Sequence, residues 1–466
     1  MSSPEDELLQ AARVWQWRLP RNFQDRMTEA FYAESAAIAG RTLTRPAGSS
    51  RLRWQHRLDQ LLTSPWTGFP IMALAFASVL WLTIAGANIP SGWISDLLIG
   101  WLYPWLRTHA IDLLGPWMAG LLVDGMYLAS AWVVSVMLPP MLIFFPVFTL
   151  LEDLGYLPRV AFNLDRVFQR VGAHGKQALT MAMGYGCNAA GVIAARVIDS
   201  PRERLIAIVT NNFALCNGRW PAQILMATIF IGALAPAHLV GLVATGAVFA
   251  IAMLGFALSL LSSWLLSRTL LRGEASTFSL ELPPYRPPNL WRTLYTSLID
   301  RTAFVLWRAV VFALPAGAVI WLVARVHLGG ESLAFWGVQG LSPLGLFLGL
   351  NGVILLAYVI AIPANEIVIP SVLMLTVLLQ GDASEAGVLV QASDETVRTL
   401  LTHAGWTPVT ALCLMLFSLC HNPCSTTLVT IYRETGSLKW TSVSALLPTA
   451  FGMVLCALVA WLAGVW

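Results

Sequence analysis

Charged side chains are scarce in this sequence, and their scarcity excludes an ordinary water-soluble protein. Asp, Glu, Lys and Arg make up 11% of the 466 residues, whereas a soluble domain carries about 25%. Hydrophobic residues make up 57%, and the mean hydropathy is +0.68. A chain with so few polar groups cannot cover its surface in water, so we expect a lipid bilayer to cover it. Apolar runs of about twenty residues, the length that a membrane-spanning helix needs, occur around 71–85, 239–266 and 441–466.

Other absences narrow the function further. The sequence contains no GxxxxGK[ST] motif, because 172–177 has a Gly-Lys pair without the required spacing or the Ser or Thr, so no P-loop nucleotide site is expected. The HExxH motif of zinc proteases is also absent. The net charge is only +3, and no nucleic-acid partner is expected. These features favour a membrane transporter over an enzyme.

Cysteine is absent from the long polar loops, which argues against a framework of disulfides. Cys413 and Cys456 lie within plain apolar runs, where a cysteine is usually a small core residue. The other four cysteines lie beside Asn, Gly or Pro, and they therefore call for a separate explanation.

Lysine and arginine indicate the topology, because positive charge marks the cytoplasmic side of a membrane protein. The first 65 residues are polar and Arg-rich and contain no apolar leader, so the N-terminus is expected in the cytoplasm. We expect a cytoplasmic amphipathic helical region at 1–62 and a transmembrane permease domain at 63–466. The remaining clusters that should face the cytoplasm are 159–176, 196–204, 268–308 and 433–439.

The predicted fold is an all-α polytopic membrane protein with about eight to ten transmembrane segments. The stretch 177–195 has basic clusters at both ends, so we expect a re-entrant hairpin that opens inward. The stretch 342–380 lies between poorly basic loops, which predicts a broken hairpin that opens outward. Two opposed hairpins favour an inverted repeat, as in many secondary transporters. The first repeat is expected at about 126–235 and the second at about 302–440.

Gly, Pro and Asn cluster at four points deep in the apolar sequence. In lipid an unpaired backbone group costs several kcal/mol, so we expect non-helical backbone only where it lines a cavity enclosed by protein. Each hairpin break is followed by a helix broken at a cysteine, which favours the inverted repeat. A rival pairing, of Cys187…Arg196 with Cys424…Arg433 at equal spacing, stays open. The four breaks are 184–188, 215–218, 363–366 and 419–424.

The side chains at these breaks include thiols, a carboxylate, an imidazole and amides. Together they suit a transition metal such as Fe(II), Mn(II), Co(II) or Zn(II) better than Na⁺ or Mg²⁺. A carboxylate well inside a membrane segment, such as Glu366, is functional by default, because burying it is costly. The candidate metal-binding residues are Cys187, Asn188, Cys216, Glu366 and Cys424.

Five further residues are secondary candidates. Arg219 either touches a substrate, pairs with a carboxylate or caps a half-helix. His421 is either a ligand or a satisfied interior histidine, and Cys420 lies one helical turn before the main candidate at 424. Glu152 and Asp153 lie at the cytoplasmic end of a predicted helix, where carboxylates serve as interface anchors, as a gate or on a transport route.

Several motifs, in order along the chain from about residue 51 to the C-terminus, resemble the membrane domain of the ferrous iron transport protein B family, FeoB. Together they make a specific signal, because they cover some 400 residues. The stretch 151–166 resembles LEDSGYMARxAFxxDR, 184–188 resembles GFGCN, 199–221 is similar to the segment with FMSCSARLP, 365–368 is similar to KEIV, and 423–437 is similar to PC…RETGS.

The resemblance implies uptake of Fe²⁺ across the bacterial cytoplasmic (inner) membrane by a multi-pass protein. Fe²⁺ is then the transported substrate, and no permanently bound cofactor is expected. The resemblance also points to Cys187, Cys216, Glu366 and Cys424 as residues of the permeation path. Family members begin with a GTP-binding domain, which this sequence does not contain, so a separate soluble GTPase and a small SH3-like companion protein are the expected partners. A homo-oligomer stays open.

The sequence departs from the family pattern at three places. Asn365 replaces a Lys, 189–190 is Ala-Ala where the family has Val-Pro, and 217–218 is Asn-Gly where the family has Ser-Ala. The expected ligands remain, but the metal preference and the coupling to GTP stay open. Two alternatives also stay open: a transporter of a nucleoside or other organic solute that shares the repeats, and a membrane partner of a soluble GTPase that transports nothing.

Overall fold

The computed structural model describes residues 23–42, 50–273, 285, 289–380 and 394–464. Helices dominate this part of the chain, and the strands β1 (His327–Leu328) and β2 (Glu331–Ser332) pair only with each other, in a short antiparallel hairpin. The predicted all-α polytopic membrane fold is therefore confirmed. The start of the predicted cytoplasmic region, 1–22, lies outside the described residues.

The first half of the chain runs from the N-terminal helices to the long helix α12. Its elements are α2 (Phe23–Thr42), α3 (Ser50–Thr63), α4 (Pro65–Ser95), η1 (Asp96–Leu102), α5 (Tyr103–Ala119), η2 (Gly120–Tyr127), α6 (Leu128–Asp153), α7 (Tyr156–Arg170), α8 (Gln177–Gly186), α9 (Asn188–Ala194), η3 (Ala195–Val197), α10 (Pro201–Thr210), η4 (Asn211–Phe213), η5 (Asn217–Arg219), α11 (Trp220–Met226), η6 (Ala227–Ile231), η7 (Gly232–Leu234), η8 (Ala237–Leu239) and α12 (Val240–Arg268).

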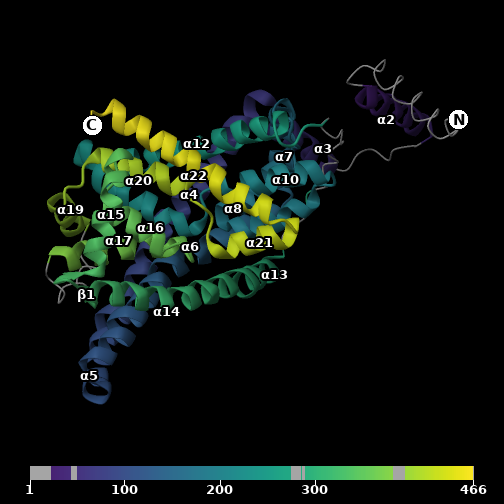
Figure 1. Cartoon of the computed structure of the whole chain (residues 1–466). Coiled ribbons are helices and arrows are strands. Elements are labelled where there is room, and N and C mark those ends of the chain that lie inside the picture. Colours follow the sequence, from purple (N-terminus) through teal and green to yellow (C-terminus); the bar gives the residue numbers. More distant parts are fainter. Residues whose placement is uncertain (1–22, 43–49, 274–284, 286–288, 381–393, 465–466) are drawn as a thin grey trace, which may run out of the picture.

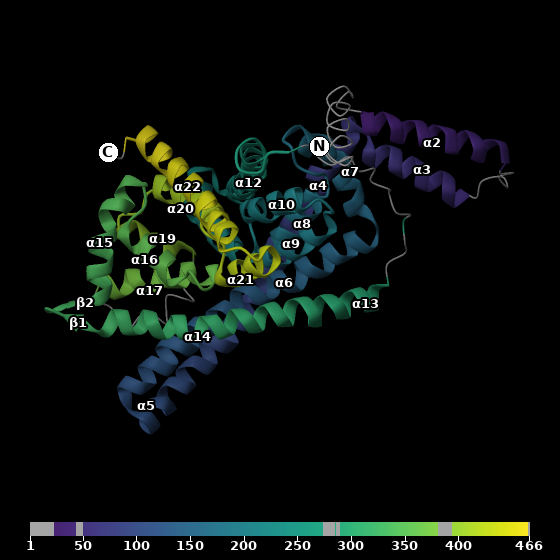
Figure 2. The same ribbon diagram turned by 45° about the vertical axis from the view of Figure 1, so that its right-hand side comes forward.

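The second half begins with a long rod, α13 to α14, that runs along one side of the molecule (Figure 1, Figure 2). Its helices are α13 (Leu290–Tyr295), η9 (Thr296–Ala303), α14 (Phe304–Arg325), α15 (Leu333–Phe347), α16 (Gly352–Ile360), η10 (Asn365–Ile367), α17 (Val368–Gln380), α19 (Asp394–His403), α20 (Pro408–Cys420), α21 (Ser425–Thr435) and α22 (Leu438–Leu462).

Local sequence signals explain where several of these helices begin and end. The side chains of Ser200, Asn351 and Thr407 accept hydrogen bonds from backbone N–H groups in the first turns of α10, α16 and α20, as N-cap residues do. Proline occupies an early position in α10 and α20, where its missing N–H costs nothing. Gly436 ends α21 with a φ of 62°, a conformation that glycine adopts without strain.

Six helical stretches of the described chain are long and apolar enough to cross a membrane, and one bent helix pair would make a seventh. The remaining helices of the interior are shorter, because the predicted breaks interrupt them. The six stretches are Pro65–Thr83, Ile89–Asp153, Val240–Arg268, Val305–Arg325, Pro408–Thr435 and Leu438–Leu462.

Both predicted hairpins contain broken helices. In the first hairpin, α8 and α9 meet at Cys187. The helix α9 folds back on α8, and a Cβ atom added to Gly191 would lie only 2.7 Å from the carbonyl oxygen of Thr180. In the second, the helix is interrupted at 361–364, between α16 and η10, and this interruption overlaps the predicted break at 363–366. The structure adds a bend of 111° between α15 and α16 that the sequence analysis did not predict. Gly349, with a φ of 66°, permits this bend.

The chain between α4 and α6 forms a helical hairpin that projects from the body near the end that carries β1 and β2 (Figure 1, Figure 2). Gly115, with a φ of 78°, and Pro116 make the turn inside α5. Asp124 holds the two arms together: it accepts a hydrogen bond from Tyr103 at 2.8 Å and pairs with Arg107 at 3.1 Å.

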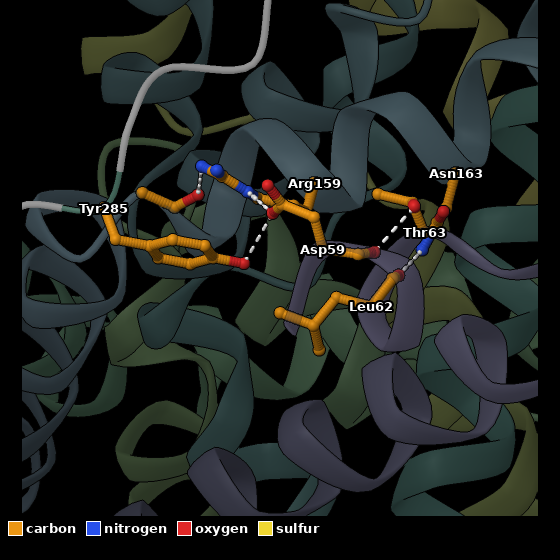
Figure 3. A network of polar contacts seen from close by, with 7 residues as sticks. Asp59, Leu62, Thr63, Arg159, Asn163 and Tyr285 are labelled. Carbon is orange, nitrogen blue, oxygen red and sulfur yellow. Dashed lines mark hydrogen bonds and ion pairs between the residues drawn. The ribbon is translucent and has the colours of Figure 1, made fainter. Parts of the chain in front are cut away.

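A network of polar contacts fixes α3 to α7 (Figure 3). Arg159 of α7 is 1% exposed, and its Nε donates to Oδ1 of Asp59 in α3 at 3.0 Å. The Tyr285 hydroxyl donates to the same oxygen at 2.8 Å, and its ring centre lies 4.0 Å from the Arg159 guanidinium carbon. Burial, aided by the hydrogen bond to Asp59, raises the pKa of Tyr285 to about 12, so the phenol keeps its proton and remains a donor. Asn163 adds a bond to the Leu62 carbonyl at 2.7 Å.

Replacing Arg159 by Ala is expected to loosen this junction. The substitution leaves Asp59 without its cation, and breaking a buried ion pair in this way costs about 3 kcal/mol of unfolding free energy. The measurement is thermal unfolding of the purified protein in detergent, with Arg166→Ala as the control, because Arg166 is exposed on the same helix. Equal falls in unfolding temperature for the two variants would contradict the assignment.

Candidate functional site

The four predicted breaks meet in the interior of the described chain. The element η5 contacts η10, and α9 packs against α21. Ser425, at the start of α21, donates from its N–H to the Ile362 carbonyl at 3.3 Å and from its hydroxyl to the Pro363 carbonyl at 2.9 Å. Breaks that are far apart in the sequence therefore lie next to one another, within the largest cluster of buried apolar side chains.

Cys187 and Cys424 occupy equivalent places in two neighbouring helices. Each is the residue immediately before its helix, α9 for Cys187 and α21 for Cys424, and both are partly exposed. At the far ends of the same helices, Arg196 and Glu434 form an ion pair with an N–O distance of 2.6 Å. This arrangement agrees with the pairing of Cys187…Arg196 with Cys424…Arg433 that the sequence left open.

Glu366 lies against Gly218, which belongs to the other predicted repeat. A Cβ atom added to Gly218 would lie 2.7 Å from Oε1 of Glu366, so glycine leaves the room that the carboxylate occupies. Glu366 interacts electrostatically with Cys187, Cys216 and Cys424, and the three thiols interact with one another. Three thiols and one carboxylate, each from a different break, therefore share one region of the interior.

These side chains do not form a closed metal site. Across the part of the chain that the structure describes, no group of three or more His, Cys, Asp or Glu side chains is close enough to hold a metal ion. The predicted ligand roles of these residues stay predictions.

Arg219 caps the C-terminal end of α20. Its side chain is 2% exposed, and Nη1 donates to the carbonyls of Leu419 at 2.8 Å and Asn212 at 3.1 Å. Nη2 donates to the His421 carbonyl at 2.8 Å and to that of Asn422 at 3.4 Å. A cation at a helix C-terminus satisfies carbonyls that have no partner within the helix. Of the predicted alternatives, the structure therefore favours the capping of a half-helix.

His421 and Cys420 have apolar surroundings. The His421 ring lies between Tyr358 and Phe417, with ring centres 4.5 Å and 5.4 Å away. Cys420 is fully buried against α22, where a Cβ atom at Gly452 would lie 2.9 Å from the Cys420 Cβ. The position of Cys420 matches the core cysteine that was weighed against a ligand role. His421 is interior but not satisfied, because its Nδ1 is buried without a hydrogen-bond partner among the described residues, and its ligand role stays a prediction.

Hydrogen bonds of Asn188 connect the first hairpin to the chain segment that follows α10. When the side-chain amide of Asn188 is oriented with its NH₂ group toward the carbonyls of Gly184 and Ala214, it donates to them at 3.0 Å and 3.1 Å. Asn211 donates in turn to the Asn188 carbonyl at 2.9 Å. The sequence analysis missed Asn211, although an amide inside the apolar run 205–216 is a usable signal. The ligand role predicted for Asn188 stays a prediction.

Two amides beside Glu366 have polar atoms without partners. Neither amide atom of Asn365 nor Nδ2 of Asn217 has a hydrogen-bond partner among the described residues, although all three atoms are buried. Buried polar atoms are nearly always paired. The sequence analysis named both residues at the breaks, and their unused bonding capacity marks them as candidates for contact with a passing solute.

Glu152 and Asp153 lie apart from this group. Both are exposed at the end of α6, and Asp153 accepts a hydrogen bond from Thr293 of α13 at 2.5 Å. Their position agrees with a role at the membrane interface.

A cavity of about 540 Å³ is lined mainly by residues of α4, α6, α11 and α12, together with Asn217. Its walls are mostly apolar and aromatic. The lining includes Trp81, Trp132, Phe144, Trp220, Ile224 and Val248. Such walls suit apolar groups better than a bare cation.

Comparison with known proteins identifies two sequence families in this chain. Residues 134–231 and 306–438 match the Gate family, described as "Nucleoside recognition". Residues 248–300 match the family described as "Ferrous iron transport protein B C terminus". No solved structure matches the chain.

Curated relatives carry matching descriptions. A protein of Staphylococcus aureus described as "Fe(2+) transporter FeoB" is 29% identical over 416 residues, which cover 86% of this chain and 58% of the relative. A protein of Campylobacter jejuni with the same description is 27% identical over 399 residues, or 83% of this chain and 61% of the relative. A Porphyromonas gingivalis relative, described as a fusion of Fe(2+) transport protein A and FeoB, is 27% identical, and the match spans 51% of its length. This chain therefore spans only part of each relative.

The accessibility of the thiols predicts an order of reactivity. Cys187 and Cys424 are partly exposed, whereas Cys413, Cys420 and Cys456 are fully buried. Alkylation needs contact with the reagent. We therefore expect iodoacetamide, applied briefly to the reduced, folded protein, to label Cys187 and Cys424 at least about tenfold faster than the three fully buried thiols. Mass spectrometry of the peptides measures the order, and denatured protein is the control in which all six thiols should react. Equal rates in the folded protein would contradict the geometry.

Proposed function

Because this chain belongs, through its membrane-spanning part, to the FeoB family of ferrous iron transport proteins, we propose that it moves Fe²⁺ into the cell across the bacterial cytoplasmic membrane. The observation that carries the proposal is the meeting of the backbone breaks. They bring Cys187, Cys216, Cys424 and Glu366 within electrostatic range of one another inside a membrane protein. Ionisable and polar groups at such a depth mark substrate pathways.

The chemistry of these groups supports a transition-metal cation as the substrate. Thiolate and carboxylate ligands together favour a borderline metal over Na⁺ or Mg²⁺. A cysteine that binds a metal gives up its proton, so the passage of Fe²⁺ involves transient deprotonation of the thiols. Transport also requires that the ion leave readily, so each ligand is proposed to bind it only transiently.

The amides beside Glu366 are proposed to belong to the path as well. Asn365 precedes Glu366 in the chain and Asn217 precedes Gly218, which lies against it, and both amides hold polar atoms that have no partner within the described chain. Amide oxygens replace part of the hydration shell of an ion without adding charge. A neutral Asn365, where the family pattern has a lysine, adds no positive charge beside the carboxylate to that of Arg219.

Energy coupling is proposed to come from another chain. The resemblance implies a GTP-binding domain, and no P-loop motif occurs in these 466 residues. A soluble GTPase that docks on the basic cytoplasmic loops and on α2 and α3 would act through the junction of α3 with α7. The fusion described for the Porphyromonas gingivalis relative supports a small companion protein as a further partner.

Flux measurements test the proposed path. Reconstituted in liposomes under reducing conditions, with and without a soluble GTP-binding domain and GTP, the protein is expected to carry Fe²⁺ to an enclosed fluorescent chelator. Glu366→Ala and Cys187→Ala should each lower the rate by about tenfold or more, because each removes a ligand of the path. Cys456→Ala is the matched control, since Cys456 is a buried residue of α22 whose thiol donates to the Cys413 carbonyl of α20 at 3.2 Å.

Failure of the parent protein to move Fe²⁺ under every condition would overturn the proposal. Equal rates for Cys187→Ala and Cys456→Ala would overturn the assignment of the path instead. Uptake that nucleosides compete for, and that is indifferent to metals, would favour the organic-solute alternative.

The orientation of the chain is a further part of the proposal: α2 and α3 face the cytoplasm, and β1 and β2 face the opposite side. Ser35 and Glu331 are exposed at these two ends, so Ser35→Cys and Glu331→Cys form a matched pair. In intact cells a membrane-impermeant maleimide should label the cysteine at 331 but leave the one at 35 unlabelled until the membrane is opened. The reverse pattern would invert the topology.

A further inference from the structure

A second cavity, of about 550 Å³, lies at the ends of α9 and α21 that are remote from Cys187 and Cys424. The two helices pack against each other, and Figure 2 shows them beside the rod of α13 and α14. The cavity is lined by Ile193, Arg196, Arg308, Val429, Thr430, Arg433 and Glu434.

Positive charge dominates this lining. Three arginines from three separate helical elements, η3, α14 and α21, face one carboxylate, that of Glu434, which is the sole acidic group among the described lining residues. Glu434 is already engaged: Nε and Nη2 of Arg196 donate to its two oxygens at 2.9 Å and 2.6 Å. The lining therefore carries more cationic than anionic charge even with this ion pair in place.

The geometry of the Arg196–Glu434 contact indicates which kind of ligand fits this cavity. It is a bidentate pair, in which a planar guanidinium offers two parallel N–H groups to two oxygens of one group. Phosphate oxygens have the same spacing and are bound by arginine in the same manner. Thr430, on the turn of α21 before Arg433 and Glu434, adds a hydroxyl to the same wall.

We propose that this cavity binds an oxyanion of the phosphate type, held by Arg196, Arg308 and Arg433. Glu434 is the internal competitor, because it occupies Arg196 when no anion is present. The ligand is either free inorganic phosphate or the phosphate of an anionic lipid headgroup, since both present the same oxygens. The proposal does not rest on iron transport, and its binding test uses no iron.

The position of the cavity gives such an anion a consequence for the proposed path. Arg308 interacts electrostatically with Cys187 as well as lining the cavity. A cation that leaves the thiols toward α9 and α21 meets the field of the three arginines, which opposes its exit. A bound oxyanion lowers that barrier by neutralising the field.

The test measures thermal unfolding of the full chain in nanodiscs. In neutral phosphatidylcholine discs, inorganic phosphate is titrated against chloride at equal ionic strength. A rise in unfolding temperature specific to phosphate identifies the free anion. Without phosphate, discs that contain phosphatidylglycerol are compared with neutral ones, and a rise confined to them identifies the headgroup.

Variants then locate the site. Arg433→Gln should weaken the response by about tenfold in half-saturating concentration, because it removes one charge-assisted pair. Glu434→Gln should strengthen the response, because it frees Arg196. Lys439→Gln is the control, since Lys439 follows α21 without lining the cavity, and it should leave the response unchanged.

Two results would overturn the proposal. One is the absence of any response to phosphate or to phosphatidylglycerol in the parent protein. The other is an equal response in the parent, Arg433→Gln and Lys439→Gln proteins, which would indicate a general salt effect. Arg433 is exposed, so its replacement should not prevent folding, and the unfolding temperature of each variant without anion verifies this.

Discussion

Every backbone group that leaves a helix inside the membrane needs a partner from the protein, and the interior of this chain is organised by that requirement. Arg219 meets it at the end of α20, where one guanidinium serves carbonyls of that helix end and the Asn212 carbonyl. Asn211 and Ser425 meet it at two further breaks, with bonds to the carbonyls of Asn188 and Pro363. At these three places, carbonyls at or beside the breaks are satisfied by side chains from elsewhere in the chain.

This requirement also joins the two predicted repeats at the place where the candidate path lies. Arg219 and Gln223 belong to the first repeat but bond to carbonyls of α20, in the second. Gly218 has no side chain, which leaves space for Glu366 of the second predicted repeat beside it. The bonds that stabilise the interior and the groups of the proposed path are therefore neighbours.

The sequence predicts the breaks well and their partners poorly. Gly, Pro and Asn in apolar surroundings are a local signal, so the positions of Cys187, Cys216 and Cys424 at non-helical backbone, and of Glu366 in the short 3-10 helix η10, follow from composition. The bonds that fix them are not local: Arg219 reaches a carbonyl 200 residues away, and no period or motif encodes that distance. The bend at Gly349 escaped prediction because one glycine in an apolar run is also compatible with a continuous helix.

Charge varies along the proposed path in a way that suits controlled release. Glu366 supplies negative charge in the interior, whereas Arg196, Arg308 and Arg433 surround the ends of α9 and α21. A cation is therefore attracted to the centre and repelled at the end, and Glu434 reduces the repulsion only partly, because Arg196 already holds it. Under the proposed function, such an order would oppose leakage of Fe²⁺ past α9 and α21 at rest. Passage would then depend on a change of charge or contact at these two helices, which is the change assigned to the proposed cytoplasmic partner.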